Sequence, residues 1–300
     1  MADVSSDRLV QEGASARVRA RGGLEIVERP GAAAPGPPRR ADLASPGAHK
    51  VRRVDLRLPE TISACLFDLD GVLTETAVLH AAAWKQAFDE LLARRAGKDG
   101  QFVPFDAVAD YDNFVDGKPR LDGTREFLRA RRIDLPEGGP GDPSGTNSVY
   151  GVANRKNDLV LDLVKQRGVT VYPGSLVFLG EVRRRSMKTA VVSSSANTAA
   201  VLRAAGLDGV FDALVDGVVA KEAHLAGKPA PDTYLEAARR LHVERSQAAV
   251  FEDAVAGVEA GRAGGFGLVV GVDRVGQAGT LLAHGADVVV ADLSELIVPG

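Results

Sequence analysis

The sequence predicts an α/β protein, with a parallel, Rossmann-like sheet as its core and a helical cap domain inserted into that core. Two observations predict this class. Short apolar runs separated by helical segments recur after residue 171, without the polar alternation of a half-exposed strand. Such runs are typical of a parallel sheet covered by helices on both faces. In addition, residues 77–168 carry helical patterns but no strand pattern, which indicates an insertion.

The core is assigned to residues 58–75 and 171–300. Its first strand is predicted in TISACLF (61–67), directly before Asp68. The later strands are predicted in TAVVS (189–193), DALVD (212–216), AAVFE (248–252), GLVVGV (267–272) and ADVVVA (286–291). Helices such as PDTYLEAARRL (231–241) lie between them, as the crossovers of a parallel sheet require.

The cap is assigned to residues 76–170. Its first helix is predicted in residues 77–95, where His80, Trp84, Phe88 and Leu91 recur at helical spacing. Two further helices are predicted in residues 122–132 and 153–168, and loops in residues 97–114 and in the Gly/Pro-rich segment 136–146.

Composition excludes several classes of protein. The chain has 300 residues, 45% of them hydrophobic, and Cys65 is its only cysteine. A disulfide framework and a cysteine-based zinc site are therefore excluded, and Cys65, in an apolar run, is interpreted as a buried structural thiol. No apolar stretch reaches the roughly 18 residues of a membrane span, and the N-terminus lacks the apolar segment of a signal peptide. We expect a cytoplasmic protein.

Charge is distributed unevenly along the chain. The net charge is -3, which argues against a general nucleic-acid binder. Residues 1–57 carry 11 Lys and Arg against 7 Asp and Glu, include PGAAAPGPPRR, and show little hydrophobic periodicity. This segment is predicted to be a disordered extension. Two interpretations of it stay open: an inert tail, or a segment that contacts nucleic acid or a membrane surface.

Polar side chains follow three predicted strands, and open parallel sheets bind ligands at that edge. Asp68 and Asp70 follow the first strand, Ser193 to Ser195 end the second, and Glu252 and Asp253 end the fourth. Lys228 lies in GKPAPD, directly before a helix. The sequence therefore predicts that one edge of the sheet gathers carboxylates, hydroxyls and a lysine.

Those residue types suit phosphoryl transfer. Four crowded carboxylates require a cation, and carboxylate oxygens suit Mg²⁺. An aspartate beside the metal can act as a nucleophile and form an acyl phosphate. Asp70 can act as acid and base if Gly71 lets the chain turn after the strand. The alternative is that the Asp-Leu-Asp-Gly stretch is only a solvated turn.

The motifs FDLDGVLTET, VVSSS, GKPAPD and FEDAVAG resemble, in order and spacing, the four motifs of the haloacid dehalogenase superfamily. The resemblance implies that Asp68 is the nucleophile and Asp70 the acid and base. It further implies that Ser193 and Lys228, with Ser194, hold the transferring phosphoryl group. Asp68, Glu252, Asp253 and the backbone of Asp70 would bind Mg²⁺.

The finer resemblance, over residues 58–298, is to the β-phosphoglucomutase family and to actinobacterial β-phosphoglucomutase-like hydrolases. That family has His and Trp on the first cap helix, an arginine after a glycine, and an RKND run. The residues that match its substrate contacts are His80, Trp84, Arg120, Lys156, Ser195 and Asn197. Without the resemblance, these would be packing, surface or helix-capping residues.

Three features depart from the family. Ala196 stands where a lysine is usual, Glu75 stands where an aspartate precedes the hinge threonine, and the loops at 97–114 and 134–150 are longer. The resemblance implies a Mg²⁺-dependent β-phosphoglucomutase acting on a small-molecule sugar phosphate, as a monomer, without a nucleic-acid or membrane partner. Two rivals stay open: a sugar-phosphate phosphatase, which the loss of the lysine at Ala196 favours, and a non-catalytic regulator that binds phosphosugars.

Overall fold

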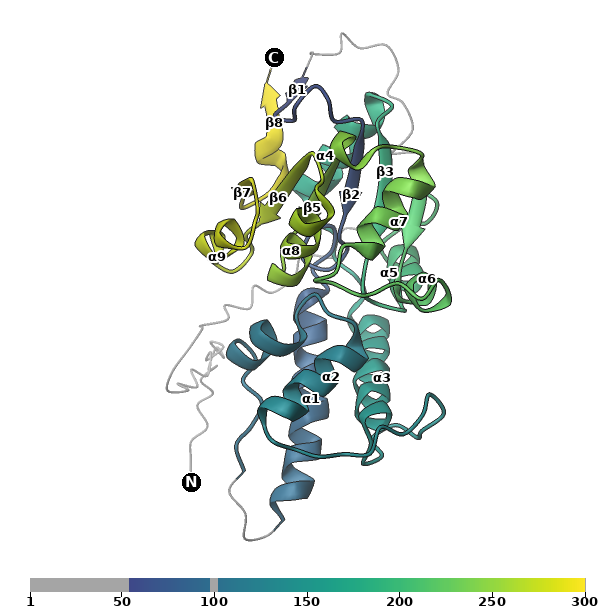
Figure 1. Ribbon diagram of the computed structural model, residues 1–300, viewed down its shortest axis with the longest axis vertical. Coiled ribbons are helices and arrows are strands. Elements are labelled where there is room, and N and C mark those ends of the chain that lie inside the picture. Colours follow the sequence, from purple (N-terminus) through teal and green to yellow (C-terminus); the bar gives the residue numbers. More distant parts are fainter. Residues whose placement is uncertain (1–53, 98–101, 300) are drawn as a thin grey trace, which may run out of the picture. The chain divides into compact units, whose positions relative to one another are not determined.

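The computed structural model describes residues 54–97 and 102–299 (Figure 1). Its main sheet has six parallel strands in the order β4-β3-β2-β5-β6-β7. Their bounds are β2 (Ala64–Phe67), β3 (Lys188–Val192), β4 (Ala213–Val215), β5 (Ala248–Glu252), β6 (Leu268–Val272) and β7 (Val288–Val290). Each predicted core strand is present, and the α/β fold class is confirmed.

The strands are apolar on both faces because helices cover both. In β2, Cys65 and Phe67 pack on one side of the sheet, and Ala64 and Leu66 pack on the other. Helices α4 (Pro173–Arg184) and α5 (Thr198–Ala204) cover the first side, and α7 (Asp232–Leu241) and α8 (Val255–Gly264) the second. The shorter core helices are α6 (Gly217–Glu222), α9 (Ala278–Ala283), η3 (Arg245–Gln247) and η4 (Leu293–Leu296).

The segment between β2 and β3 is helical, as predicted. It contains α1 (Ala77–Ala96), η2 (Tyr111–Val115), α2 (Arg120–Ala130) and α3 (Val149–Arg167). These helices enclose an apolar core of their own, in which the ring centroids of Phe88 and Phe127 lie 4.0 Å apart. A separate core allows the cap to keep its shape independently of the sheet.

The N-terminal boundary differs from the prediction. Strand β1 (Val54–Leu56) pairs antiparallel with β8 (Ile297–Pro299) in a second, two-stranded sheet. These three residues lie inside the predicted disordered extension, because three residues are too few to show a strand pattern and the partner strand lies at the other end of the chain. The rest of that extension, residues 1–53, lies outside the described residues.

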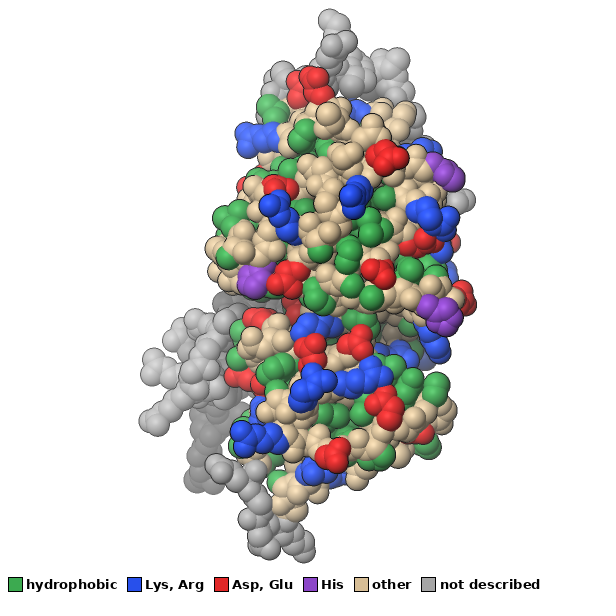
Figure 2. All heavy atoms as spheres, viewed as in Figure 1, with side chains coloured by type: hydrophobic (Ala, Val, Ile, Leu, Met, Phe, Trp, Pro, Cys, Tyr) green, Lys and Arg blue, Asp and Glu red, His purple; other side chains and the backbone are tan. Residues whose placement is uncertain are grey.

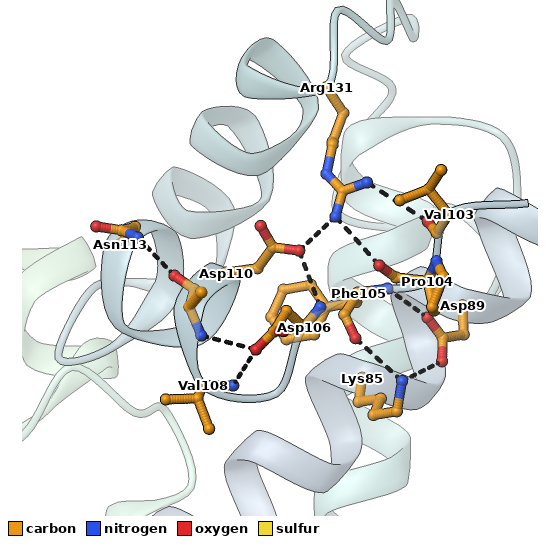
Figure 3. Close-up of polar contacts among 11 residues, drawn as sticks. Lys85, Asp89, Val103, Pro104, Phe105, Asp106, Val108, Asp110, Asn113 and Arg131 are labelled. Carbon is orange, nitrogen blue, oxygen red and sulfur yellow. Dashed lines mark hydrogen bonds and ion pairs between the residues drawn. The ribbon is translucent and has the colours of Figure 1, made fainter. Parts of the chain in front are cut away.

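The cap segment after α1 is fixed by polar contacts (Figure 3). Lys85 Nζ donates to Asp89 Oδ2 at 2.8 Å and to the Phe105 carbonyl at 3.0 Å, while the Phe105 amide donates to Asp89 Oδ1 at 2.7 Å. Arg131, the residue that follows α2, donates to Asp110. The segment was predicted to be a loop, but these contacts anchor it to both helices and lead it into the π-helix η2.

The visible surface mixes both signs of charge. Figure 2 shows Lys and Arg interspersed with Asp and Glu over the face that it presents. A nucleic-acid-binding face typically carries a basic stripe instead. Within residues 54–97 and 102–299, no helix is long and apolar enough to cross a membrane.

Candidate active site

Asp68 lies at the end of β2, between β3 and β5. Its amide continues the strand pairing by donating to the Phe251 carbonyl at 2.9 Å. Its side chain is only 10% exposed, and its Oδ1 lies 2.6 Å from Lys228 Nζ. The predicted nucleophile is therefore fixed by backbone pairing on one side and by a buried cation on the other.

A tight turn follows and brings Asp70 to the same edge. Gly71 has φ +85°, and its amide donates to the Thr74 carbonyl at 2.7 Å. A side chain at Gly71 is excluded because a Cβ atom would lie 1.7 Å from Asp253 Oδ2. Asp70 Oδ1 accepts a hydrogen bond from Thr76, at the start of the cap. The turn that the sequence required of Gly71 is present.

The ammonium group of Lys228 connects the end of β3 with the carboxylates at the ends of β2 and β5. Besides Asp68, its Nζ donates to the Val192 carbonyl at 3.1 Å and to Glu252 Oε1. Tyr234 also donates to Glu252 Oε1, at 2.8 Å. Burial alone would lower the pKa of Lys228, but the charges of Asp68 and Glu252 outweigh burial and raise it. The lysine therefore stays protonated.

Three carboxylates at this edge form a candidate metal site. Asp68, Glu252 and Asp253 each offer an oxygen, and these atoms lie within 4.8 Å of one another. Burial raises the pKa of both Asp68 and Asp253. For Asp253 the neighbouring negative charges raise the pKa further, whereas for Asp68 the charge of Lys228 opposes the increase. One lysine cannot neutralise three clustered carboxylates, two of them buried, so the residues fit a divalent cation with oxygen ligands such as Mg²⁺. The carboxylate of Asp70 is not in this cluster.

The serines at the end of β3 lie on the side of Asp68 that is opposite to Glu252 and Asp253. Ser193 is buried, and its Oγ accepts from the Ser195 amide at 3.1 Å. The Ser195 hydroxyl oxygen accepts in turn from the Asn197 amide, also at 3.1 Å. These bonds order the loop that starts α5, and leave the two hydroxyl protons available for phosphate oxygens.

The cap contributes a histidine and a lysine that face Asp70. His80 Nε2 has no hydrogen-bond partner in the described residues and lies 3.8 Å from Asp70 Oδ1. Lys156 Nζ, from α3, lies 3.1 Å from His80 Nδ1 and 4.9 Å from the centre of the Trp84 ring. Burial lowers the pKa of Lys156 to about 7 and that of His80 to about 4. Trp84 also stacks on Phe88 in the cap core.

Further hydrogen bonds join the cap and the core over the cavity. Arg120 Nη1 donates to Asn157 Oδ1 at 2.8 Å, and Asn197 Nδ2, from the core, donates to the same oxygen at 3.0 Å. Ser194 Oγ donates to the cap carbonyl of Gly117 at 2.7 Å. These contacts bring the predicted cap residues over the edge of the sheet.

All the predicted site residues except Lys228 line one cavity between the cap and the edge of the sheet. They are Asp68, Asp70, His80, Trp84, Arg120, Lys156, Ser193, Ser194, Ser195, Asn197, Glu252 and Asp253. The cavity also has lining residues that sequence reasoning missed, among them Tyr111, Val115, Lys118 and Asn157. Asn157 stands within the RKND run, which could have revealed it. Tyr111 lay in a predicted loop and gave no signal.

The cap also places a carboxylate near the acidic cluster. Burial, with the charges of Glu252 and Asp112, raises the pKa of Asp116 to about 7. Tyr111 donates a hydrogen bond to this carboxylate, and the charge of Asp116 contributes to the raised pKa of Asp253. The resemblance did not point to Asp116.

The hinge accommodates the substitution at Glu75. The Glu75 amide donates to the Thr170 carbonyl at 2.9 Å, and its side chain is exposed. Thr74 forms an antiparallel bridge with Val171. The two chain crossings between core and cap therefore lie side by side, and the longer side chain points away from the cavity.

The fold and the site define a class of protein: an α/β phosphotransferase with an aspartate pair after its first core strand and a helical cap. A model of the haloacid dehalogenase-like hydrolases matches residues 62–265, and the chain belongs to that family. It is an enzyme of this phosphotransferase type. The family resemblance seen in the sequence is confirmed, and it excludes the non-catalytic alternative.

Within that family, the chain is similar to several β-phosphoglucomutases. The chain is 54% identical over 261 residues to a β-phosphoglucomutase of Mycobacterium bovis, covering 86% of this chain and all of the relative. It is 31% identical over 237 residues to a β-phosphoglucomutase of Bacillus subtilis, covering 78% and 92%. The crystal structure of a β-phosphoglucomutase from Clostridium difficile superimposes with a TM-score of 0.63 at 26% identity, covering 78% and 93%.

Proposed function

We propose that the chain is a Mg²⁺-dependent β-phosphoglucomutase of the cytoplasm that acts as a monomer. It interconverts β-glucose 1-phosphate and glucose 6-phosphate through β-glucose 1,6-bisphosphate. The observation that carries the proposal is a single cavity lined by a phosphoryl-transfer edge on the core and by Arg120 and Lys156 on the cap. A mutase must hold a sugar with a phosphate at each end, which requires cationic groups on both sides.

Asp68 is the nucleophile in this proposal. Its oxygen attacks the phosphorus of the donor, the bond to the sugar oxygen breaks, and an aspartyl phosphate forms. Lys228 and Ser193 hold the phosphoryl oxygens from the core side. Mg²⁺, when held by Asp68, Glu252, Asp253 and the Asp70 backbone, supplies positive charge that reduces repulsion between nucleophile and phosphate. The residual buried negative charge of the cluster supports this assignment.

Asp70 exchanges the proton of the sugar hydroxyl. It protonates the departing sugar oxygen in one half-reaction and removes the proton of the attacking hydroxyl in the other. Thr76 binds its Oδ1, and His80 lies 3.8 Å away, so the carboxylate is oriented by cap residues. Acid and base function is thereby linked to closure of the cap, which keeps water from the aspartyl phosphate.

The cap holds the rest of the substrate. Arg120, half-buried at the start of α2, would grip the distal phosphate with Ser195 and Asn197. Lys156, buried against Trp84 and His80, would donate to sugar hydroxyls. Cations in a site of low polarity bind phosphate more strongly than they do in water.

A phosphatase is the second candidate, because Ala196 lines the cavity where the mutase family usually has a lysine. A weaker distal phosphate site would let the bisphosphate escape, and water would then accept the phosphoryl group. The two functions are separated by following purified protein, β-glucose 1-phosphate and Mg²⁺ by ³¹P NMR. Glucose 6-phosphate as the dominant product supports the mutase; inorganic phosphate as the dominant product supports the phosphatase and overturns the proposal.

A further inference from the structure

The turn that carries Asp70 is held from its far side by Arg274, a residue in the loop after β6. Arg274 Nε donates to the Gly71 carbonyl at 2.9 Å, and its Nη2 lies 3.4 Å from the Val72 carbonyl. Its Nη1 donates to the Ala291 carbonyl at 2.8 Å and pairs with Asp292 at 3.2 Å. One guanidinium therefore ties the turn to the loop after β7.

The same guanidinium contacts the second crossing between cap and core. Its Cζ lies 3.6 Å from the centre of the Tyr172 ring. The Tyr172 amide donates to the Leu73 carbonyl at 3.0 Å, and Ser175 Oγ donates to the Val72 carbonyl at 2.6 Å. Arg274 thus binds both crossings where they lie side by side.

The opposite side of the turn faces the acidic cluster. Gly71 lies so close to Asp253 that a Cβ atom would overlap its carboxylate. The turn is therefore enclosed between the candidate metal ligand in front and the guanidinium behind. Because Asp70 is joined to Gly71 by a peptide bond, Arg274 restrains the backbone that carries the Asp70 side chain.

We propose that Arg274 is a positioning residue that holds Asp70 in the geometry needed for proton transfer. This inference rests on the proposed function, in which Asp70 is the acid and base. Arginine suits the role because its planar fork donates in several fixed directions and its face stacks on an aromatic ring. Lysine would keep the charge but could not reproduce these contacts together.

The test compares two phosphoryl donors in single turnovers with enzyme in excess. Transfer from β-glucose 1,6-bisphosphate to Asp68 needs a proton on the sugar oxygen, whereas transfer from p-nitrophenyl phosphate does not. Arg274→Ala and Arg274→Lys are expected to slow the first transfer by roughly 10- to 100-fold, the scale of a small misplacement of a catalytic group. The second transfer should change by less than about 3-fold, since its leaving group needs no acid.

Two reference variants make the result decisive. Arg240→Ala removes another arginine that donates to a backbone carbonyl, that of Leu214 at 2.9 Å, remote from the turn, and should leave the ratio of the two rates unchanged. Asp70→Asn should show the same selectivity as the Arg274 variants.

If Asp70→Asn is selective and both Arg274 variants are not, the inference fails and the proposed function stands. If Asp70→Asn itself slows both donors equally, the acid and base assignment fails. Arg274→Lys serves if the alanine variant does not fold.

Discussion

At the scale of single residues, the main feature of the site is that carboxylates outnumber the cationic side chains at this edge of the sheet. Lys228 binds Asp68 and Glu252 together, so it orients the proposed nucleophile while it neutralises part of the charge. Among the described residues no lysine or arginine forms an ion pair with Asp253, and burial with nearby negative charges raises its pKa. Asp68 and Asp253 therefore differ in environment although both lie at the same edge, because only Asp68 is oriented by Lys228.

The nucleophile assignment predicts the behaviour of Asp68→Asn. The amide keeps the size of the carboxylate, but its oxygen is too weak a nucleophile to form the acyl phosphate, so turnover should fall by at least about 10³-fold, as when other nucleophiles are removed. Lys228 keeps its bond to Glu252, so thermal stability should change little. Steady-state rates and calorimetry check both points. A variant that keeps a tenth of the wild-type rate contradicts the assignment.

At the scale of elements, the strands were predictable because burial on both faces leaves a continuous apolar run, as in Ala248–Glu252. The strand-end carboxylates followed from that prediction. The start of α3 was less predictable. The sequence suggested residue 153, but Ser148 caps the helix by accepting from the Gly151 amide at 3.0 Å. Gly151 within the first turn hid this start, because glycine is a poor helix former.

Contacts between distant elements were not predictable from the sequence. Asn157 receives hydrogen bonds from Arg120 and from Asn197, which lie 37 and 40 positions away in the chain. Arg155, in the same run, instead pairs with Glu90 on α1 through two bonds of 2.8 Å. Neighbouring residues of one motif thus serve different purposes, which only their position on the helix decides.

The proposed contact of Arg120 with the distal phosphate predicts a selective effect of Arg120→Ala. Loss of a charge-assisted contact inside a closed site should cost about 2–4 kcal/mol, or roughly 30- to 1,000-fold in isomerisation rate. Hydrolysis of p-nitrophenyl phosphate, which has no second phosphate, should change little. The exposed Arg129→Ala on the same helix is the matched control. If both activities fall together, Arg120 is structural and the mutase proposal loses its main cap contact.

Helix α7 predicts a pH dependence of stability. Hydrogen bonds from Arg239 and Arg240 lower the pKa of Glu236 to about 2. Because this pKa is depressed in the folded state, the stabilisation is complete above the unfolded value of about 4.5 and is lost as pH falls toward 2. Glu236→Gln should therefore lower the free energy of unfolding by up to about 1 kcal/mol at pH 7, the range of exposed pairs. The difference from wild type, measured in urea, should shrink below pH 4; a constant difference contradicts the origin in ionisation.

At the scale of the whole molecule, the cap and the core have separate apolar interiors and share a polar cavity. Phe88 and Phe127 belong to the first, and Phe67 and Phe251 to the second. The contacts of Ser194 with Gly117 and of Asn197 with Asn157 are hydrogen bonds between polar groups. Such contacts can be exchanged for water at small cost, so the cap can open for substrate without exposing either apolar core.

The ends of the core also define how far the N-terminus can be shortened. Sequence alone predicts that residues 1–57 are a disordered extension, whereas β1 pairs with β8 beside the buried Leu296. Removal of residues 1–52 should leave melting temperature and activity unchanged. Removal of residues 1–57 also deletes β1, which unpairs β8 and uncovers apolar side chains that include Leu296. We expect this longer deletion to lower the melting temperature by about 2–4 °C per kcal/mol lost, with activity at 25 °C preserved because the strand pair is not part of the cavity. Equal melting temperatures for the two truncated proteins would show that β1 contributes nothing to the stability of the core.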